Sequence, residues 1–393
     1  ADWLERLGFW PVIAGGGGLG GEADGKGRVT PVPGGALGVQ LVRGDFNATA
    51  VGTVTHVVGD RVLAFGHPFF QMGTFVAPAV NAEVHAIMSS MARSFKLASP
   101  REPVGAMVGD WLSCIVVETT AKAPLVPVEL RTINHTTGEE ETYRLEVVQH
   151  PFLTPWLLQM AMTEAVQAAS PTSGDATVRT RLRLETARRP LELENTFHQW
   201  PIGMAGQLWQ RLSALFQSPF GDPELRAVNA VVEITHERRT AEIKGAYFTR
   251  SEIERGGVAE LRVTLMPFGG VESTVTVPIH VPAFESQRAL VVSVLPGGQA
   301  PADVAPPETM SDYLTVLEKQ HRNTDLVVLV RRSGQGLRYR GKWLKNLPPS
   351  ASMLLDDAST MGIIGAGDVE QIVVPTGWVL SGRATARVAI RTS

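Results

Sequence analysis

The sequence contains almost no cysteine. Cys114 is the single cysteine among the 393 residues, and it opens the apolar run Cys-Ile-Val-Val. One thiol excludes an internal disulfide and a zinc site built from several thiolates. We therefore expect Cys114 to behave as a small buried hydrophobic residue.

An excess of positive charge and long hydrophobic runs are missing as well. The 36 lysines and arginines are outnumbered by 39 aspartates and glutamates, for a formal net charge of −3. Such a balance gives no basic surface of the kind that binds nucleic acid, so we predict no nucleic-acid partner. No apolar run approaches the roughly 20 residues that span a bilayer, so we predict no transmembrane span in this chain.

The motifs of metal and cofactor sites are scarce too. The nine histidines show no paired spacing of the kind that holds zinc, and we predict no metal site. Gly16, Gly18 and Gly21 fit the pattern G-x-G-x-x-G, but no strong strand precedes them. We interpret this stretch as a glycine-rich linker and predict that the protein uses no cofactor.

Short alternating segments dominate the rest of the chain and predict a mainly β (α+β) fold. Strands are expected near residues 37–43, 47–58, 61–66, 103–109, 113–119, 125–134, 142–149, 176–185, 228–236, 240–249, 258–266, 272–281, 291–295, 326–331, 369–374, 378–380 and 384–390. Helices are expected at 155–169, at about 201–217, and from an N-cap at Ser311 to about residue 321. Residues 81–91 fit either a strand or a helical stretch.

Breaks in this pattern suggest four parts. Residues 1–35 are expected to hold a short helix and the glycine-rich linker, and residues 36–185 a β-barrel or sandwich. Residues 186–285 are expected to form a helix followed by an immunoglobulin-like sandwich, because the turns are evenly spaced. Residues 286–393 are expected to form a small mixed α/β domain.

One segment, residues 44–69, carries the clearest chemical signal. It reads GDFNATAVGTVTHVVGDRVLAFGHPF, which is typical of two strands around a Gly59-Asp60 turn that end at Gly66-His67-Pro68. Gly66 allows a sharp turn and Pro68 fixes the exit, so the imidazole of His67 is expected to be held in one place. A general base needs this kind of placement.

At this segment and at residues 94–111, SFKLASPREPVGAMVGDW, the chain resembles the SpoIVB peptidase family of bacterial serine endopeptidases. The resemblance is strong over residues 37–118 and suggests a long, multidomain member. It implies a peptidase-like domain at residues 36–185, with His67 as the general base. It also implies an exported bacterial protein, located in the periplasm or cell envelope.

The family's serine motif, GMSGSP, is missing from the sequence. Residues 203–207 are a near match with Ala205 at the serine position, but the surrounding apolar spacing favours the start of a helix. Ser99 is a possible substitute nucleophile, although a turn before Pro100 explains it better. Asp110 could orient His67 or could be a turn aspartate.

Two functions follow from this pattern. The first is a non-catalytic binding or scaffold subunit, a pseudoenzyme with protein partners in a membrane-anchored envelope complex such as a respiratory or photosynthetic assembly. The alternative is a serine endopeptidase in which His67 is the general base and the serine lies on an upstream segment absent from this sequence. The sequence leaves open whether the protein is an enzyme.

Overall fold

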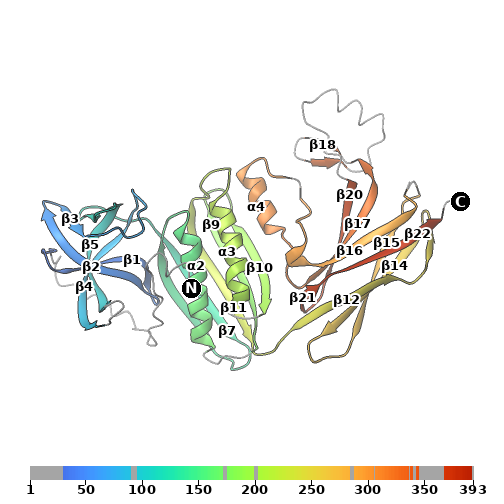
Figure 1. Ribbon diagram of the computed structural model, residues 1–393, viewed down its shortest axis with the longest axis horizontal. Helices are drawn as coiled ribbons and strands as arrows, with labels where there is room; N and C mark the ends of the chain where they lie inside the picture. Colours follow the sequence, from blue (N-terminus) through green and yellow to red (C-terminus); the bar gives the residue numbers. More distant parts are fainter. Residues whose placement is uncertain are drawn as a thin grey trace.

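The computed structural model describes residues 30–89, 95–170, 175–198, 202–283, 287–304, 306–335, 337–339, 342–344 and 367–391. The predicted N-terminal helix and glycine-rich linker lie outside these ranges. The fold is mainly β, as the alternating pattern predicted. Three regions follow one another along the long axis: a six-stranded barrel, a sheet covered by helices, and a β-sandwich (Figure 1).

The first region is a barrel closed by hydrogen bonds. Its strands are β1 (Ala36–Gly44), β2 (Ala48–Val58), β3 (Arg61–Ala64), β4 (Ala77–Met88), β5 (Phe95–Asp110) and β6 (Ile115–Glu118). They pair in the order β1-β2-β3-β6-β5-β4, and β4 closes the ring by pairing with β1 at Leu37↔Asn81 and Val39↔Ala79. Residues 81–88 therefore continue β4 as a strand. This half of β4 lacked a clear pattern in the sequence because it is largely exposed.

Strand β1 belongs to two regions at once. Leu37 to Gln40 pair with β2 in the barrel, while Val42 to Gly44 pair with β8 (Glu140–Val148) in the next sheet. The register of the strand with β2 shifts between Gln40 and Val42, and its last residue, Gly44, has a φ of +117°. A Cβ atom there would lie 2.4 Å from the carbonyl oxygen of Arg144, so the close approach of the two strands requires glycine.

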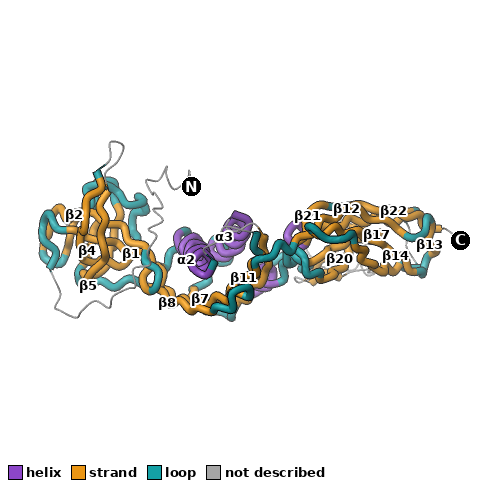
Figure 2. Tube along the Cα trace, turned by 90° about the horizontal axis from the view of Figure 1, so that it is seen from below, coloured by secondary structure: helices purple, strands orange, loops and turns teal. Residues whose placement is uncertain are grey.

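The second region is a five-stranded sheet with helices on one face (Figure 2). Its strands β7 (Leu125–Asn134), β8, β9 (Thr177–Thr186), β10 (Leu191–His198) and β11 (Leu225–Thr235) pair in the order β10-β9-β11-β7-β8. The helices are α2 (Leu153–Ala169) and α3 (Ile202–Phe216). Apolar residues of the strands alternate with charged ones, so one face packs on the helices and the other meets solvent.

The open face of this sheet carries ion pairs across neighbouring strands. Arg179 of β9 pairs with Glu194 of β10, and both Arg179 and Arg181 pair with Glu233 of β11. Arg144 of β8 pairs with Glu129 of β7 at 3.2 Å. These charges neutralise one another along the face.

The third region is a sandwich of two sheets around one apolar core. Its first sheet has the order β15-β14-β12-β21 and its second β13-β22-β16-β17-β20. The strands are β12 (Thr240–Phe248), β13 (Glu252–Glu254), β14 (Val258–Pro267), β15 (Ser273–His280), β16 (Ala289–Pro296), β17 (Asp325–Gln335), β20 (Gly367–Pro375), β21 (Val379–Gly382) and β22 (Ala384–Arg391). Two short strands, β18 (Leu337–Tyr339) and β19 (Lys342–Leu344), form a separate pair.

A connection inside the sandwich reaches back to the helix-covered sheet. Between β16 and β17 lie the short 3-10 helix η1 (Gly297–Gln299) and helix α4 (Met310–Glu318). Met310, Leu314 and Leu317 of α4 belong to the core that the barrel and the helix-covered sheet share. The N-cap of α4 is Thr309 rather than the predicted Ser311, because Thr309 and Asp312 form a reciprocal capping box.

The structure divides the chain differently from the predicted boundaries at residues 185 and 285. The first boundary cuts the sheet at β9, which is hydrogen-bonded to β10 on one side and β11 on the other. The second separates β12, β14 and β15 from strands that share their core. Strand β21, for example, pairs with β12 although nearly the whole sandwich separates them in sequence. Such long-range pairing leaves no local signal, so the sequence suggested two small domains where there is one sandwich.

Candidate functional site

The predicted histidine lies just beyond the end of β3, on a tight corner of the barrel. Phe65 and Gly66 both have positive φ values, +75° and +74°. The amide of Phe65 donates to the carbonyl oxygen of Thr53 at 2.9 Å, which fixes the corner to β2. The ring of Phe65 lies against Gly52, where a Cβ atom would be 2.1 Å from the ring. The corner is thus held by packing and by a backbone hydrogen bond, as Gly66 and Pro68 predicted.

The imidazole of His67 is exposed and has a defined tautomer. Its Nδ1 lies 2.7 Å from the carbonyl oxygen of Pro68. A carbonyl oxygen can only accept, so Nδ1 carries the proton and Nε2 of the neutral ring is left as an acceptor. An exposed Nε2 acceptor is the state that a general base requires.

Asp110 does not take the orienting role considered for it. Its side chain is completely buried, and its oxygens accept from three backbone amides: Phe69 at 2.7 Å, Phe70 at 2.7 Å and Met72 at 3.1 Å. The backbone of Asp110 also exchanges two hydrogen bonds with Gly73. The carboxylate therefore holds the loop after His67, and His67 is oriented by its neighbour Pro68 instead.

Within the described residues, no serine, threonine or cysteine side chain is hydrogen-bonded to His67. Ser99 instead lies 2.8 Å from Nε2 of His85, on the exposed extension of β4 and β5. Ala205 lies in the first turn of α3, as the helical reading of residues 203–207 predicted. Cys114 is half-buried rather than buried. The structure thus brings together neither Ser99 nor Asp110 with His67.

Two features at this end of the barrel were missed in the sequence. Lys96 donates to the hydroxyl of Thr53 at 2.7 Å, next to the corner. Trp111 and Leu112, in the turn between β5 and β6, are 50% and 71% exposed. The signal for Trp111 was Gly109, whose missing side chain leaves room for the indole ring.

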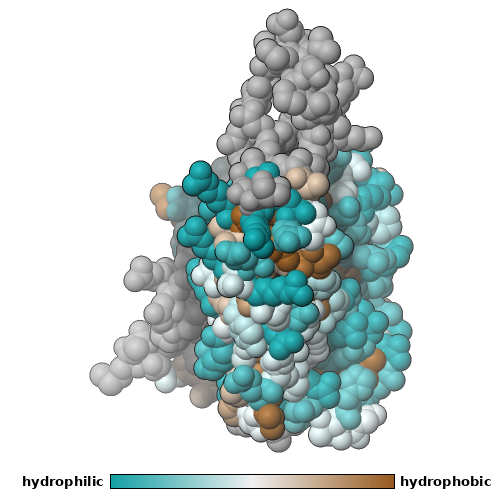
Figure 3. Space-filling model, turned by 90° about the vertical axis from the view of Figure 1, so that its right-hand side faces the viewer, coloured by the Kyte–Doolittle hydropathy of each residue, from teal (hydrophilic) through white to brown (hydrophobic). Residues whose placement is uncertain are grey.

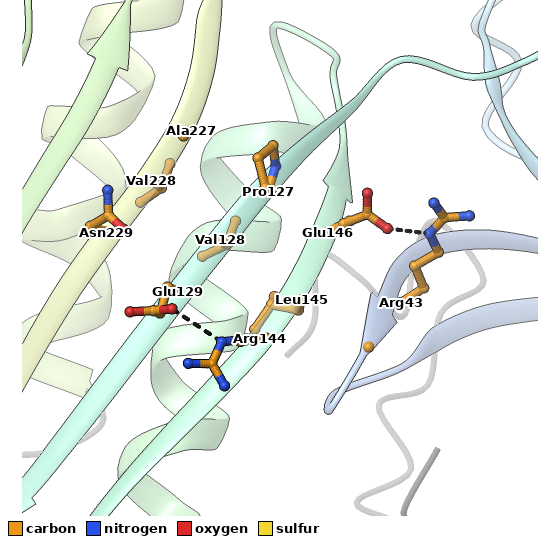
Figure 4. A pocket seen from close by; sticks show the side chains of 11 residues that line it. Arg43, Pro127, Val128, Glu129, Arg144, Leu145, Glu146, Ala227, Val228 and Asn229 are labelled. Atoms are coloured by element: carbon orange, nitrogen blue, oxygen red, sulfur yellow. Dashed lines mark hydrogen bonds and ion pairs between the residues drawn. The ribbon is translucent and has the colours of Figure 1, made fainter. Parts of the chain in front are cut away.

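Another groove lies where β1 meets β8, and it has a volume of about 480 Å³ (Figure 4). Its charged side chains pair with one another, Arg43 with Glu146 at 2.6 Å and Arg144 with Glu129 at 3.2 Å. In the part of the chain that the structure describes, no group of three or more potential ligands is placed to hold a metal ion. None of the described helices is long and apolar enough to cross a membrane.

The candidate site therefore combines a fixed, exposed histidine with a clamped loop and an adjacent apolar turn. This arrangement can accept a hydrogen bond and offer apolar surface, and the described residues add no nucleophile to it. Comparisons of the chain with protein-family models, with curated proteins and with solved structures found no match.

Proposed function

We propose that the protein is a non-catalytic binding or scaffold subunit built on a fold resembling that of SpoIVB peptidases. The observation that carries the proposal is the state of His67, which is positioned as a base while no described hydroxyl or thiol is bonded to it. A Ser–His site works only when the nucleophile lies within hydrogen-bond reach of the base. A site without the nucleophile can still bind a partner through its surface, but it cannot carry out peptide hydrolysis by the Ser–His mechanism.

The resemblance also supports a location in the periplasm or cell envelope of a bacterium, with protein partners in a membrane-anchored complex. A scaffold subunit of this kind should be recovered from its native source in an assembly much larger than 42.3 kDa. Size-exclusion chromatography with light scattering, after mild detergent extraction, measures this mass. Recovery of the native protein as a free monomer would argue against the scaffold function.

A second function is supported by the tautomer of His67. With Nδ1–H bound to Pro68, Nε2 could take a proton from a serine supplied by a segment outside this sequence. The protein would then be a serine endopeptidase of the SpoIVB type. In that case the nucleophile would lie on that other segment and would not have been lost.

Labelling of the native protein with a fluorophosphonate probe distinguishes the two functions. The scaffold function predicts no labelling of the protein, while a known serine hydrolase in the same sample is labelled. Labelling that is lost in a His67→Ala variant would show a working serine and would establish the peptidase instead.

A further inference from the structure

The turn between β5 and β6 presents apolar side chains to solvent beside His67. Trp111 is 50% exposed and Leu112 is 71% exposed. Phe69, two residues after His67, donates its amide to Asp110, which directly precedes Trp111. This hydrogen bond joins the loop after His67 to the strand that leads into the apolar turn, and we call His67, Trp111 and Leu112 together the Trp111 surface.

The indole of Trp111 is fixed before any partner binds. A Cβ atom at Gly109 would lie 2.6 Å from its Nε1, and one at Gly73 would lie 3.6 Å from its six-membered ring. The ring thus lies over two glycines, one on β5 and one on the loop that Asp110 holds. The amide of Trp111 also donates to the carbonyl oxygen of Cys114 at 3.0 Å. A half-exposed aromatic ring that is already ordered loses little conformational entropy on binding.

The surroundings of this surface are nearly free of charge. The segments 62–82 and 103–117 build this part of the barrel and together contain one Asp, Glu, Lys or Arg, the buried Asp110. At the chain average of 19% charged residues, segments of that length would carry about seven. Lys96 approaches from the extension of β5, where its ammonium donates to Thr53. Within these two segments a basic partner segment would find no exposed carboxylate to compensate its desolvation, and an acidic one would find Lys96 alone nearby.

His67 adds one polar requirement. Its Nε2 accepts no hydrogen bond within the described residues, and covering it without a donor would cost free energy. The backbone amide of a peptide supplies such a donor, whereas the acyl chains of a lipid do not. The surface consequently fits a polypeptide better than a membrane.

From these observations we infer that the Trp111 surface docks an uncharged, apolar segment of a partner protein, with Trp111 and Leu112 as anchors and His67 as hydrogen-bond acceptor. This inference rests on the proposed binding function and identifies its surface. The face in Figure 3 is mainly polar with small, separated hydrophobic patches.

Random heptapeptides displayed on phage and panned against the full chain test the inference. Wild-type protein should enrich uncharged, apolar peptides, and a Trp111→Ala, Leu112→Gln double variant should not. The matched control is Val271→Asn, which removes an 86% exposed apolar side chain from the turn between β14 and β15. It should enrich the same peptides as the wild type. Urea unfolding should show that all the variants remain folded under the panning conditions, although the double variant loses the packing of Trp111 over Gly73 and Gly109.

Fluorescence anisotropy with an enriched peptide then measures affinity. Trp111→Ala should weaken binding at least about tenfold, as expected for an aromatic anchor. His67→Ala should weaken it about two- to tenfold, as expected for loss of one hydrogen bond. Val271→Asn should leave it within about twofold of the wild type, as expected for a residue outside the interface.

Several results would overturn the inference: no enrichment on the wild type, enrichment of charged peptides, or binding that the double variant retains. Sedimentation with phosphatidylcholine–phosphatidylglycerol vesicles that is lost in the double variant would also overturn it, because the turn would then be a membrane anchor. A separate measurement tests the proposed scaffold function: labelling of the protein by the fluorophosphonate probe would contradict it. If the probe labels the protein and peptide binding still depends on Trp111, the docking surface would be supported, but the protein would be a peptidase rather than a scaffold.

Discussion

Asp110 and His67 have different roles at the corner of the barrel. The carboxylate is buried and fully occupied by backbone amides, while the imidazole is exposed and keeps one acceptor for another molecule. The order of the loop after His67 therefore depends on a residue of another strand. Substitution of Asp110 should therefore disturb the structure of this loop first, and any chemistry of His67 only as a consequence.

We expect Asp110→Asn to lower the free energy of unfolding by about 2–3 kcal/mol, because hydrogen bonds to a charged acceptor are lost and the new NH2 group faces a backbone N–H. Urea unfolding followed by circular dichroism measures the change. Asp60→Asn, in the exposed turn between β2 and β3, is the control and should change stability by less than about 0.5 kcal/mol. If both substitutions changed the free energy of unfolding equally, the Asp110 carboxylate would not be holding the loop after His67.

Gly52 is a second residue on which the corner depends. In Gly52→Ala the new methyl group would overlap the ring of Phe65, so we expect a loss of about 1–3 kcal/mol from overpacking. Gly206→Ala is the matched control, since nothing lies within 4 Å of its Cβ position in α3. There alanine should stabilise the protein by about 0.5–1 kcal/mol. Thermal unfolding shows whether each variant is more or less stable than the wild type. A stabilised Gly52→Ala variant would show that the ring of Phe65 does not pack against Gly52.

At the residue scale, the sequence predicted the placement of His67 because its constraints are local. Gly66 and Pro68 are its direct neighbours, and both are visible in the motif. The role of Asp110 was not predictable, because its partners are backbone amides some forty positions away and every residue type but proline supplies an amide. The exposed Trp111 was missed for a related reason: burial depends on what packs against a residue, and the sequence does not record it.

Among the elements, helix α2 is preceded by a histidine, His150, whose side chain caps the amides at the start of the helix although the N-cap residue itself is Phe152. Nδ1 of His150 accepts from the amides of Phe152 and Leu153 at 3.2 and 3.3 Å. The ring also packs edge-on against Phe75 of the barrel core. Burial lowers the pKa of His150, so the neutral, accepting form is favoured in the folded protein. Protonation would remove an acceptor and place a positive charge at the N-terminus of a helix, where it is unfavourable.

This cap should make stability depend on pH. The unfolded chain, with a histidine pKa of about 6.5, binds a proton more readily than the folded one. The stabilisation is therefore complete above pH ~6.5 and is lost as the pH falls through and below that value. In His150→Asn the side chain can still accept from these amides but does not titrate. We expect its urea midpoint to change less between pH 7.5 and pH 5 than that of the wild type; an equal change would assign the effect to other groups.

Most strands were predictable because one face of each sheet is buried and the other exposed. Strand β9, for example, alternates buried Leu182 and Leu184 with exposed Arg181 and Arg183. The prediction was weakest in the outer half of β4, which lacks that contrast. Strand β10 was overlooked, although Leu191 and Leu193 alternate with glutamates. Leucine and glutamate are also strong helix formers, which weakens the strand signal there.

At the scale of the whole molecule, the sandwich and the helix-covered sheet are joined by a buried polar contact. The side-chain amide of Asn323, just before β17, donates to the carbonyl oxygen of Thr196 at 3.0 Å and to Gln207 at 2.8 Å. Its backbone amide donates to Asn195 at 2.7 Å. Arg189 adds an ion pair to Glu318 of α4 at 3.0 Å. These contacts lie beside the packed face of α4, so the two regions should unfold together.

Asn323→Ala removes both side-chain hydrogen bonds and leaves their partners without a donor. We expect a loss of about 2–3 kcal/mol. Differential scanning calorimetry should show one transition for the wild type and two for the variant, because the sandwich would melt apart from the rest. Asn229→Ala, on the open face of the sheet, should keep the single transition. Two transitions already in the wild type would contradict the coupling.

The arrangement of the regions was the part least accessible from the sequence. Helix α4 completes a core whose other buried members lie between Leu37 and Ile234. Strand β7 pairs in parallel with β11, although β8, α2, the β9–β10 hairpin and α3 lie between them in sequence. Composition and periodicity describe each element but not its neighbours. The predicted boundaries accordingly followed local breaks, whereas the real ones follow long-range pairing.

Strand β1 has a mechanical consequence. It is the strand that the barrel and the next sheet share, so a pull on the barrel passes into β8 through the pairs Val42↔Val147 and Gly44↔Leu145. Tension applied along β1 would load these hydrogen bonds in shear, all at once, rather than opening them one by one. If the protein links parts of an assembly that move relative to each other, this strand would carry the strain between them, just after the register shift between Gln40 and Val42.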